Sequence, residues 1–440
     1  MEPETLALLM FVAVMIGIFS GFHVAFVLAG IGLIFGFIGW GQVVFSQMVS
    51  RTAWVMMNDA LPAVPLFVFM GCIMERAGIA EKAFGIFQVA LGPLRGSIAL
   101  ATVFLCTLFA AGTGIVGAPV TVMGLLALPA MMRRKYDIQL ATGSILAGGT
   151  LGILIPPSIM LILYGPLAGI SVARLFTAGI MPGLLLSSLY LSYIIIRCYI
   201  QPSAGPSLPP EERAIPVLKL LVSMVTGMAP FFLIILAVLG SIIMGLAAPV
   251  EAAAVGATCG ILLAIAYRKF TWQSLKESVY ATIRISTMVL IIAVGASIFC
   301  GVFLALGGGD VITRVLMGLP LGPYGVLAVI MFIIFLMGFL IDWIAILLIF
   351  IPILAPIIPA LGFDPLWFAL VFAVCLQTSF LTPPFAVSIF YLKGVAPPEV
   401  ELTDIFKGVI PFVILQLIGL ALVIVFPQII MWLPGVVYGF

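Results

Sequence analysis

The feature that most constrains this chain is the recurrence of apolar runs about twenty residues long with almost no charged side chains. Folded as a helix, a run of that length spans the hydrocarbon core of a bilayer. Hydrophobic residues make up 64% of the chain and charged residues 8%, whereas soluble domains carry about 25% charged residues. The sequence therefore predicts an all-α polytopic membrane protein embedded in the lipid bilayer, with about ten spanning segments.

Several classes of function are disfavoured by what the sequence contains. A net charge of +2 gives no basis for binding nucleic acid. The sequence has no GxxxxGK[ST] phosphate loop, so the chain is not expected to hydrolyse ATP by itself. His23 is the only histidine, which argues against metal or Ser-His catalysis. We therefore expect no organic cofactor, and an intramembrane enzyme is kept only as a remote alternative.

The two halves of the chain share a pattern of residues at an offset of 227. The set holds one register without a gap: Pro129 with Pro356, Asp137 with Asp364, Leu154 with Leu381, Pro156-Pro157 with Pro383-Pro384, Ile162 with Ile389, and Tyr164 with Tyr391. Internal repeats of this kind are common in secondary transporters. The sequence predicts a first repeat over residues 1–205 and a second over 215–440. They are joined by a linker at 206–214 within the polar, Pro-rich stretch from Gln201 to Arg213.

Each predicted repeat contains scaffold helices, a re-entrant hairpin, a broken helix and a last helix. In the first half these are helices near 4–20, 22–40 and 54–75 (the scaffold, 1–75), a hairpin at 97–133, a broken helix at 139–169 and a helix at 174–200. In the second half they are helices near 215–243, 248–267 and 284–306 (the scaffold, 215–306), a hairpin at 322–360, a broken helix at 366–393 and a helix at 403–433. Amphipathic stretches at 41–53 and 268–283 are expected to lie at the membrane interface as separate arms.

Five crossings in each half would place the second repeat upside down relative to the first. With that topology, fifteen of the eighteen Lys and Arg residues fall on one side, and only Arg51, Arg174 and Arg314 fall on the other. The positive-inside rule makes the basic-rich side cytoplasmic. Both termini are then expected outside the cytoplasm, and the two repeats have inverted topology.

Four non-helical places at membrane depth are the candidate site, because bare backbone in a bilayer must line a protein cavity. The first hairpin turns at Gly112, Thr113 and Gly114, and the second turns between Gly338 and Asp342. The helix breaks contain Pro156, Pro157 and Ser158 in the first half, and Thr378, Ser379, Thr382, Pro383 and Pro384 in the second. Exposed helix N-termini attract carboxylates, while freed carbonyls and hydroxyls bind Na⁺. These residues are predicted to bind a carboxylate and its coupling Na⁺, with no other metal.

Single polar residues have both a functional and a plainer interpretation. Asp342 lies between apolar runs, where an unpaired charge is costly, and is predicted to bind a cation or anchor the hairpin tip. The plainer alternative is a helix cap. Asp137 and Asp364 are expected to cap the helices that follow them, and His23 is expected to make a polar contact near a helix end.

Five segments of the sequence resemble the large membrane (M) subunit of tripartite ATP-independent periplasmic (TRAP) transporters, of the ion-transporter superfamily. They are PLFVFMGCIMERAGIAEKAF (65–84), GTGIVGAPVTVMG (112–124), ATGSILAGGTLGILIPPSIMLILYG (141–165), APVEAAAVGA (248–257) and LQTSFLTPPFAVSIFYLKGVAP (376–397). The likeness covers nearly the whole chain. It implies an elevator-type transporter in which hairpins and broken helices move against the scaffold.

The same resemblance implies partners and a location. The partners are a small four-helix membrane (Q) subunit and a periplasmic substrate-binding protein that delivers an organic acid. The location is the bacterial inner membrane, with Na⁺ as the coupling ion. A stand-alone Na⁺-coupled carboxylate carrier of the same superfamily remains the alternative.

Overall fold

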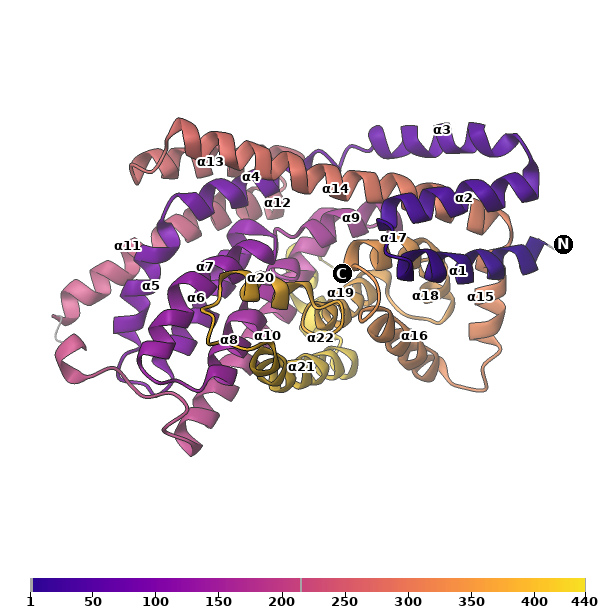
Figure 1. Ribbon diagram of the computed structural model, residues 1–440. Helices are drawn as coiled ribbons and strands as arrows, with labels where there is room; N and C mark the ends of the chain where they lie inside the picture. Colours follow the sequence, from indigo (N-terminus) through magenta and orange to yellow (C-terminus); the bar gives the residue numbers. More distant parts are fainter. Residues whose placement is uncertain (1–2, 214–215, 440) are drawn as a thin grey trace.

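The computed structural model describes residues 3–213 and 216–439, and every regular element in these ranges is helical. The predicted all-α class is confirmed for this part of the chain. The helices form two groups, which we call the frame and the body (Figure 1). In Figure 1 the frame helices α13, α14, α2 and α3 run as a long band along one side. The body lies beneath this band.

The frame consists of the helices that come first in each half of the chain. Its centre is the 34-residue helix α14, which packs against α2, α3 and α4. The frame helices are α1 (Pro3–Phe19), α2 (Val24–Trp40), α3 (Val43–Met56), α4 (Ala63–Arg76), α5 (Ile79–Ala90), α11 (Val217–Ile235), α12 (Ser241–Ile243), α13 (Pro249–Ala266), α14 (Trp272–Ala305) and α15 (Gly308–Met317). A π-helical stretch over Leu236–Gly240 connects α11 with α12.

The body consists of the hairpin helices, the broken helices and the last helices of both halves. Helix α8 lies in its middle and packs against α6, α7 and α21. The body helices are α6 (Ser97–Thr113), α7 (Gly117–Arg133), α8 (Ile138–Thr150), α9 (Ile159–Ala168), α10 (Val172–Ile200), α16 (Pro323–Met337), α17 (Trp343–Leu354), α18 (Ile357–Ala360), α19 (Pro365–Gln377), α20 (Val387–Val395), α21 (Leu402–Val425) and α22 (Gln428–Tyr438).

Elements of the two halves recur at the offset found in the sequence. Helices α8 and α19 have thirteen residues each, and each continues into a three-residue 3₁₀ turn, Leu151–Ile153 and Thr378–Phe380. Asp137 caps α8 by accepting from Gln139 N (2.9 Å), and Asp364 caps α19 by accepting from Trp367 N (2.9 Å). Both predicted caps are confirmed.

The lengths of the helices agree with a multi-pass membrane protein. Five described helical segments are long and apolar enough to cross a bilayer: Val172–Ile200, Leu218–Ile243, Pro249–Ala266, Trp272–Ala305 and Leu402–Val425. Helices α4 and α5, which meet at 61°, qualify together as a sixth. The remaining apolar helices have 10–17 residues, so the predicted count of ten spanning segments remains a prediction.

Several predicted boundaries were wrong. The second arm, 268–283, is not separate, because α14 runs unbroken from Trp272 to Ala305. In the first half the matching stretch is interrupted between Met56 and Ala63, where Asn58 and Pro62 favour a turn. The sequence also did not indicate α5 and α15, and it merged α21 with α22. Pro427, which sits at the N-cap of α22, separates that pair.

The Pro-rich linker is docked on the body. Gly96 N donates to Gly205 O (2.8 Å), and Leu208 N donates to Gly92 O (3.0 Å). The Tyr136 hydroxyl donates to Pro206 O (2.9 Å). Burial raises the pKa of this phenol, which keeps it protonated as a donor. The described part of the linker therefore packs against the body. Residues 214 and 215 lie outside the described ranges.

Candidate functional site

A cavity of about 560 Å³ lies where the hairpin tips and helix breaks of the body meet the frame. The body contributes the residues that follow each tip and flank each break: Gly114, Ile115, Val116, Gly117, Ala118, Thr121, Ile153, Ile159, Asp342, Trp343, Ile344, Phe380, Phe385, Val387 and Tyr391. The frame contributes Phe22, His23, Val24, Cys72, Glu75, Arg76, Ala281, Ile285, Met288, Val289 and Ile292. Both halves of the chain thus build one cavity.

Each hairpin tip packs on the broken helix of its own half, with glycine at the contact. Gly114 has a φ of 65°, and a Cβ there would lie 2.5 Å from Pro157 O. A Cβ on Gly338 would lie 2.6 Å from Ser379 Cβ. No side chain fits at either contact without movement, so glycine allows the tips to approach the breaks.

At both breaks a proline leaves one main-chain carbonyl without its helical donor, and at both breaks a serine hydroxyl donates to that carbonyl instead. Ile153 O and Phe380 O lose their helical donors because Pro157 and Pro384 have no N–H. Ser158 Oγ donates to Ile153 O, and Ser388 Oγ donates to Phe380 O. The other proline of each pair, Pro156 or Pro383, likewise removes the amide donor that the carbonyl four residues earlier would use. Those carbonyls belong to Gly152 and Ser379.

These two carbonyls come from residues beside the hairpin tips. A Cβ on Gly152 would lie 2.6 Å from Ile115 O, just beyond the first tip, and Ser379 contacts Gly338. Each nearby hydroxyl donates its hydrogen bond to a main-chain carbonyl: Thr113 Oγ1 to Phe109 O (2.9 Å), Thr378 Oγ1 to Cys375 O (2.7 Å), Ser379 Oγ to Leu376 O (2.6 Å) and Thr382 Oγ1 to Thr378 O (2.8 Å). Their remaining lone pairs are acceptors, the groups that Na⁺ requires.

Four helices, α7, α9, α17 and α20, begin at the cavity, so their N-termini face it. Residues from the first turn of each line it: Gly117, Ile159, Trp343 and Val387. Asp342 caps α17 by accepting from Ile344 N (3.0 Å). The N-cap residues of the other three, Val116, Ser158 and Ala386, make no side-chain cap hydrogen bond. Three helix N-termini therefore keep donors for an anion.

The side chains of Asp, Glu, Lys and Arg residues that line the cavity are those of Asp342 from the body and of Glu75 and Arg76 from the frame. Arg76 Nη1 donates to Cys72 O (3.1 Å), and its Nε lies 3.5 Å from Glu277 Oε2. His23 caps α2 by accepting from Ala25 N over 3.4 Å. The polar contact expected for His23 near a helix end is confirmed. The cavity thus places an arginine opposite the N-termini of the body.

The structure distributes the predicted site residues unevenly around this cavity. Gly114 and Asp342 line it. Gly112, Thr113, Pro156, Pro157, Ser158, Gly338, Thr378, Ser379 and Thr382 are buried behind the lining, whereas Pro383 and Pro384 are exposed. The plainer interpretation of Asp342 as a helix cap is confirmed, and its cation role stays a prediction.

The frame side of the cavity, which includes Glu75 and Arg76, was not predicted from the sequence. The Gly152 carbonyl was not predicted either, although it lies four residues before Pro156 and so loses its helical donor. The frame residues carry no local sequence signal because only tertiary packing brings α2, α4 and α14 to the tips.

The family described as "Tripartite ATP-independent periplasmic transporter, DctM component" matches residues 5–429. The chain belongs to this family. It is therefore the large (M) subunit of a TRAP transporter, and the resemblance inferred from the sequence is confirmed.

Relatives within the TRAP large permease family are named for different solutes. The chain is 30% identical to the C4-dicarboxylate TRAP transporter large permease protein DctM of Pseudomonas aeruginosa, over 85% of this chain and 86% of that protein. It is 29% identical to the ectoine TRAP transporter large permease protein TeaC of Halomonas elongata, over 97% and 99%. It is also 30% identical to the isethionate TRAP transporter permease protein DctMQ of Oleidesulfovibrio alaskensis, over 86% of this chain and 59% of that longer protein.

Solved structures extend the likeness in fold beyond the TRAP family. The YdaH transporter of Alcanivorax borkumensis superposes with a TM-score of 0.57 at 16% identity, covering 89% of this chain and 90% of that one. MtrF of Neisseria gonorrhoeae superposes with a TM-score of 0.54 at 13% identity, covering 91% and 85%. The TRAP relatives are named as permeases, so this subunit is a multi-pass membrane transporter component and not an enzyme.

Proposed function

We propose that this M subunit binds an organic acid anion at the 560 Å³ cavity and imports it together with Na⁺. The observation that carries the proposal is the convergence of the α7, α9, α17 and α20 N-termini on one cavity, three of them without a side-chain cap. Each of the three uncapped termini, those of α7, α9 and α20, offers unpaired N–H groups and the positive end of a helix dipole. A carboxylate is the simplest solute group that such donors would stabilise.

Sodium is the proposed coupling ion, with one site at each hairpin tip. The first site would use the Gly152 carbonyl beside Gly112, Thr113 and Gly114. The second would use the Ser379 carbonyl with Gly338, Thr378 and Thr382, and Asp342 would supply negative charge nearby. The freed carbonyls and lone pairs described above support this assignment, because Na⁺ binds neutral oxygen ligands of this kind.

Transport is proposed to follow an elevator motion of the body along the frame. The body carries both tips and both breaks, while α14 lines the cavity from the frame, so a shift of one group along the other would carry the site with the body. The recurrence of elements at 227 residues and the uneven distribution of Lys and Arg support two repeats of inverted topology.

The proposed assembly contains a small four-helix Q subunit and a periplasmic substrate-binding protein, in a bacterial inner membrane with both termini of this chain periplasmic. The family description names a tripartite periplasmic transporter, which supports this composition. A stand-alone carrier is the second candidate, supported by the fold likeness to transporters outside the TRAP family.

Uptake into proteoliposomes tests the proposal. The chain is reconstituted with and without its partner subunits and assayed with labelled succinate, pyruvate, lactate, gluconate and isethionate under inward Na⁺ or choline gradients. We expect uptake of at least one acid only with the partners and only with Na⁺. Equal uptake in choline would overturn the coupling, and Na⁺-driven uptake by the chain alone would establish the stand-alone carrier instead.

A further inference from the structure

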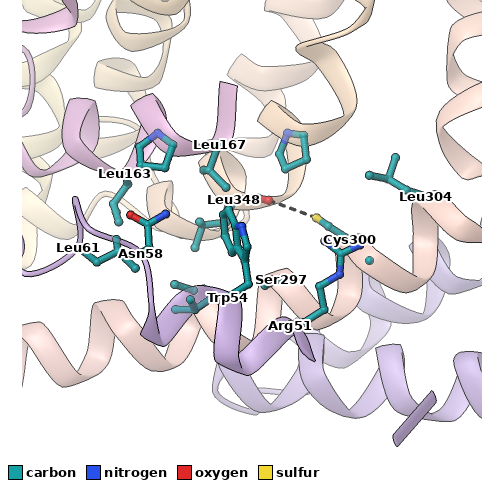
Figure 2. A pocket seen from close by; sticks show the side chains of 15 residues that line it. Arg51, Trp54, Asn58, Leu61, Leu163, Leu167, Ser297, Cys300, Leu304 and Leu348 are labelled. Carbon is teal, nitrogen blue, oxygen red and sulfur yellow. Dashed lines mark hydrogen bonds between the residues drawn. The ribbon is translucent and has the colours of Figure 1, made fainter. Parts of the chain in front are cut away.

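A second, smaller cavity lies between the frame and the body, farther along α14. It measures about 160 Å³ and is bounded by α3, α9, α14 and α17. Figure 2 shows Arg51 and Trp54 reaching into it from α3, and Cys300 and Leu348 facing it from α14 and α17. Arg51 is the only charged residue among those that line it.

Arg51 differs from the two other basic residues assigned to the face with few Lys and Arg. Arg314 forms an exposed ion pair with Glu4. Arg174 lies over the ring of Tyr438, 5.9 Å from its centroid. Arg51 has no ion pair with any carboxylate in residues 3–213 and 216–439. A half-buried guanidinium without a counter-ion costs free energy unless an anion joins it.

The surroundings of Arg51 supply a further donor and no competing acid. Asn58 lines the same cavity, and its Oδ1 accepts from Ala60 N (3.0 Å), which leaves the side-chain NH₂ as a donor. The Arg51 guanidinium rests on Gly301, where a Cβ would lie 2.6 Å from Nε. Leu348 O, freed by Pro352, accepts from Cys300 Sγ (3.2 Å). Apart from the Ser297 hydroxyl, which can donate or accept, the polar side-chain groups left for a ligand are donors.

The two cavities follow one another along a single frame helix. Residues of α14 up to Ile292 line the larger cavity, and residues from Ala293 onward line the smaller one. From Met288, which lines the larger cavity, to Gly301, which contacts Arg51, the helix rises about 20 Å. A body that moves along α14 by about that distance would bring an anion bound beside Met288 to Arg51. Arg76 lies farther back along α14, beside Glu277.

We propose that Arg51 and Asn58 form an anion-binding subsite for the carboxylate or sulfonate group of the solute when the body occupies the opposite end of its travel. This inference rests on the proposed transport function. It places a frame guanidinium at the end of the movement that lies away from Arg76.

The site itself is tested by chemical modification of the purified chain in phosphatidylcholine vesicles. Arg51 and Arg314 are followed in separate peptides during reaction with phenylglyoxal, with and without succinate or isethionate. We expect these anions to slow modification of Arg51 several-fold and to leave Arg314 unchanged. Absence of protection by either anion would overturn the site. Protection that appears only when phosphatidylglycerol is added, without either anion, would assign the site to a lipid headgroup and overturn the proposal.

The role in transport is tested in the complete transporter with Arg51→Gln, Arg51→Lys and the control Arg314→Gln, using the acid that the wild type takes up. We expect Arg51→Gln to raise the half-saturating concentration for uptake at least tenfold while that for efflux changes less than twofold. Lys should restore part of the affinity. Equal losses in both directions, or none, would overturn the inference. Failure of Na⁺-driven uptake in the wild type would instead overturn the proposed function.

Discussion

Gln377 donates a hydrogen bond from its side-chain amide to the main-chain carbonyl of Thr150 over 3.3 Å, and 227 residues separate the two positions. That separation equals the offset of the repeat, so equivalent ends of α8 and α19 meet. Gln416 Nε2 also reaches Thr150 Oγ1 (3.4 Å). All three side chains are fully buried, and the contact joins the two halves inside the body.

Removing this contact should destabilise the body. Gln377→Leu leaves the buried Thr150 carbonyl without its donor, which should lower the free energy of unfolding by about 1–3 kcal/mol. Thermal unfolding in detergent measures the effect. The control is Gln273→Leu, because the Gln273 side chain donates to Glu277 on an exposed surface. Equal melting temperatures for both variants would show that the bond contributes nothing.

Gly338→Ala should impair transport through the second tip. The added Cβ would lie 2.6 Å from Ser379 Cβ, so the tip must withdraw from the break at a cost of about 1–3 kcal/mol. We expect a several-fold lower uptake rate and a weaker dependence on Na⁺. Gly394→Ala, on α20 with nothing within 4 Å, is the matched control and should transport normally. Normal uptake by Gly338→Ala would refute the close packing.

Asp342 can be tested for charge and for capping separately. Asp342→Asn keeps an acceptor for Ile344 N but removes the charge. If Asp342 contributes to a cation site, the half-saturating Na⁺ concentration should rise at least about tenfold, equivalent to 1.4 kcal/mol, while the yield of folded protein stays the same. Asp364→Asn, which alters only the cap of α19, should leave Na⁺ dependence unchanged. An unaltered Na⁺ response in Asp342→Asn would reduce Asp342 to a cap.

Thr382→Ala should weaken Na⁺ dependence with little loss of folded protein. Its hydroxyl donates a hydrogen bond to Thr378 O (2.8 Å), which leaves the lone pairs of the hydroxyl oxygen for an ion. Losing one neutral ligand worth about 1 kcal/mol should raise the half-saturating Na⁺ concentration about fivefold. Thr258→Ala removes the same kind of bond, to Ala254 O (2.9 Å), on an exposed face of α13. Identical behaviour of the two variants would remove Thr382 from the site.

Local chemistry in the sequence was sufficient for much of the fold. Proline pairs and glycines identified both breaks and both tips, and Asp137 and Asp364 identified two helix starts. The wrong helix boundaries lie where no local sequence signal marks the end of a helix. Helix α14 continues through residue 284 because nothing in that stretch breaks it, while Asn58 and Pro62 interrupt its counterpart in the first half.

By itself, the sequence determined that the chain is a helical membrane protein and where its helices must be interrupted, because hydrophobic length and proline act within a few residues. Only the tertiary structure decided that four helices begin at one cavity, that Arg76 and Arg51 line successive cavities along α14, and that Thr150 contacts Gln377. Those relationships join residues far apart in the chain, and packing of the complete body against the frame brings them together.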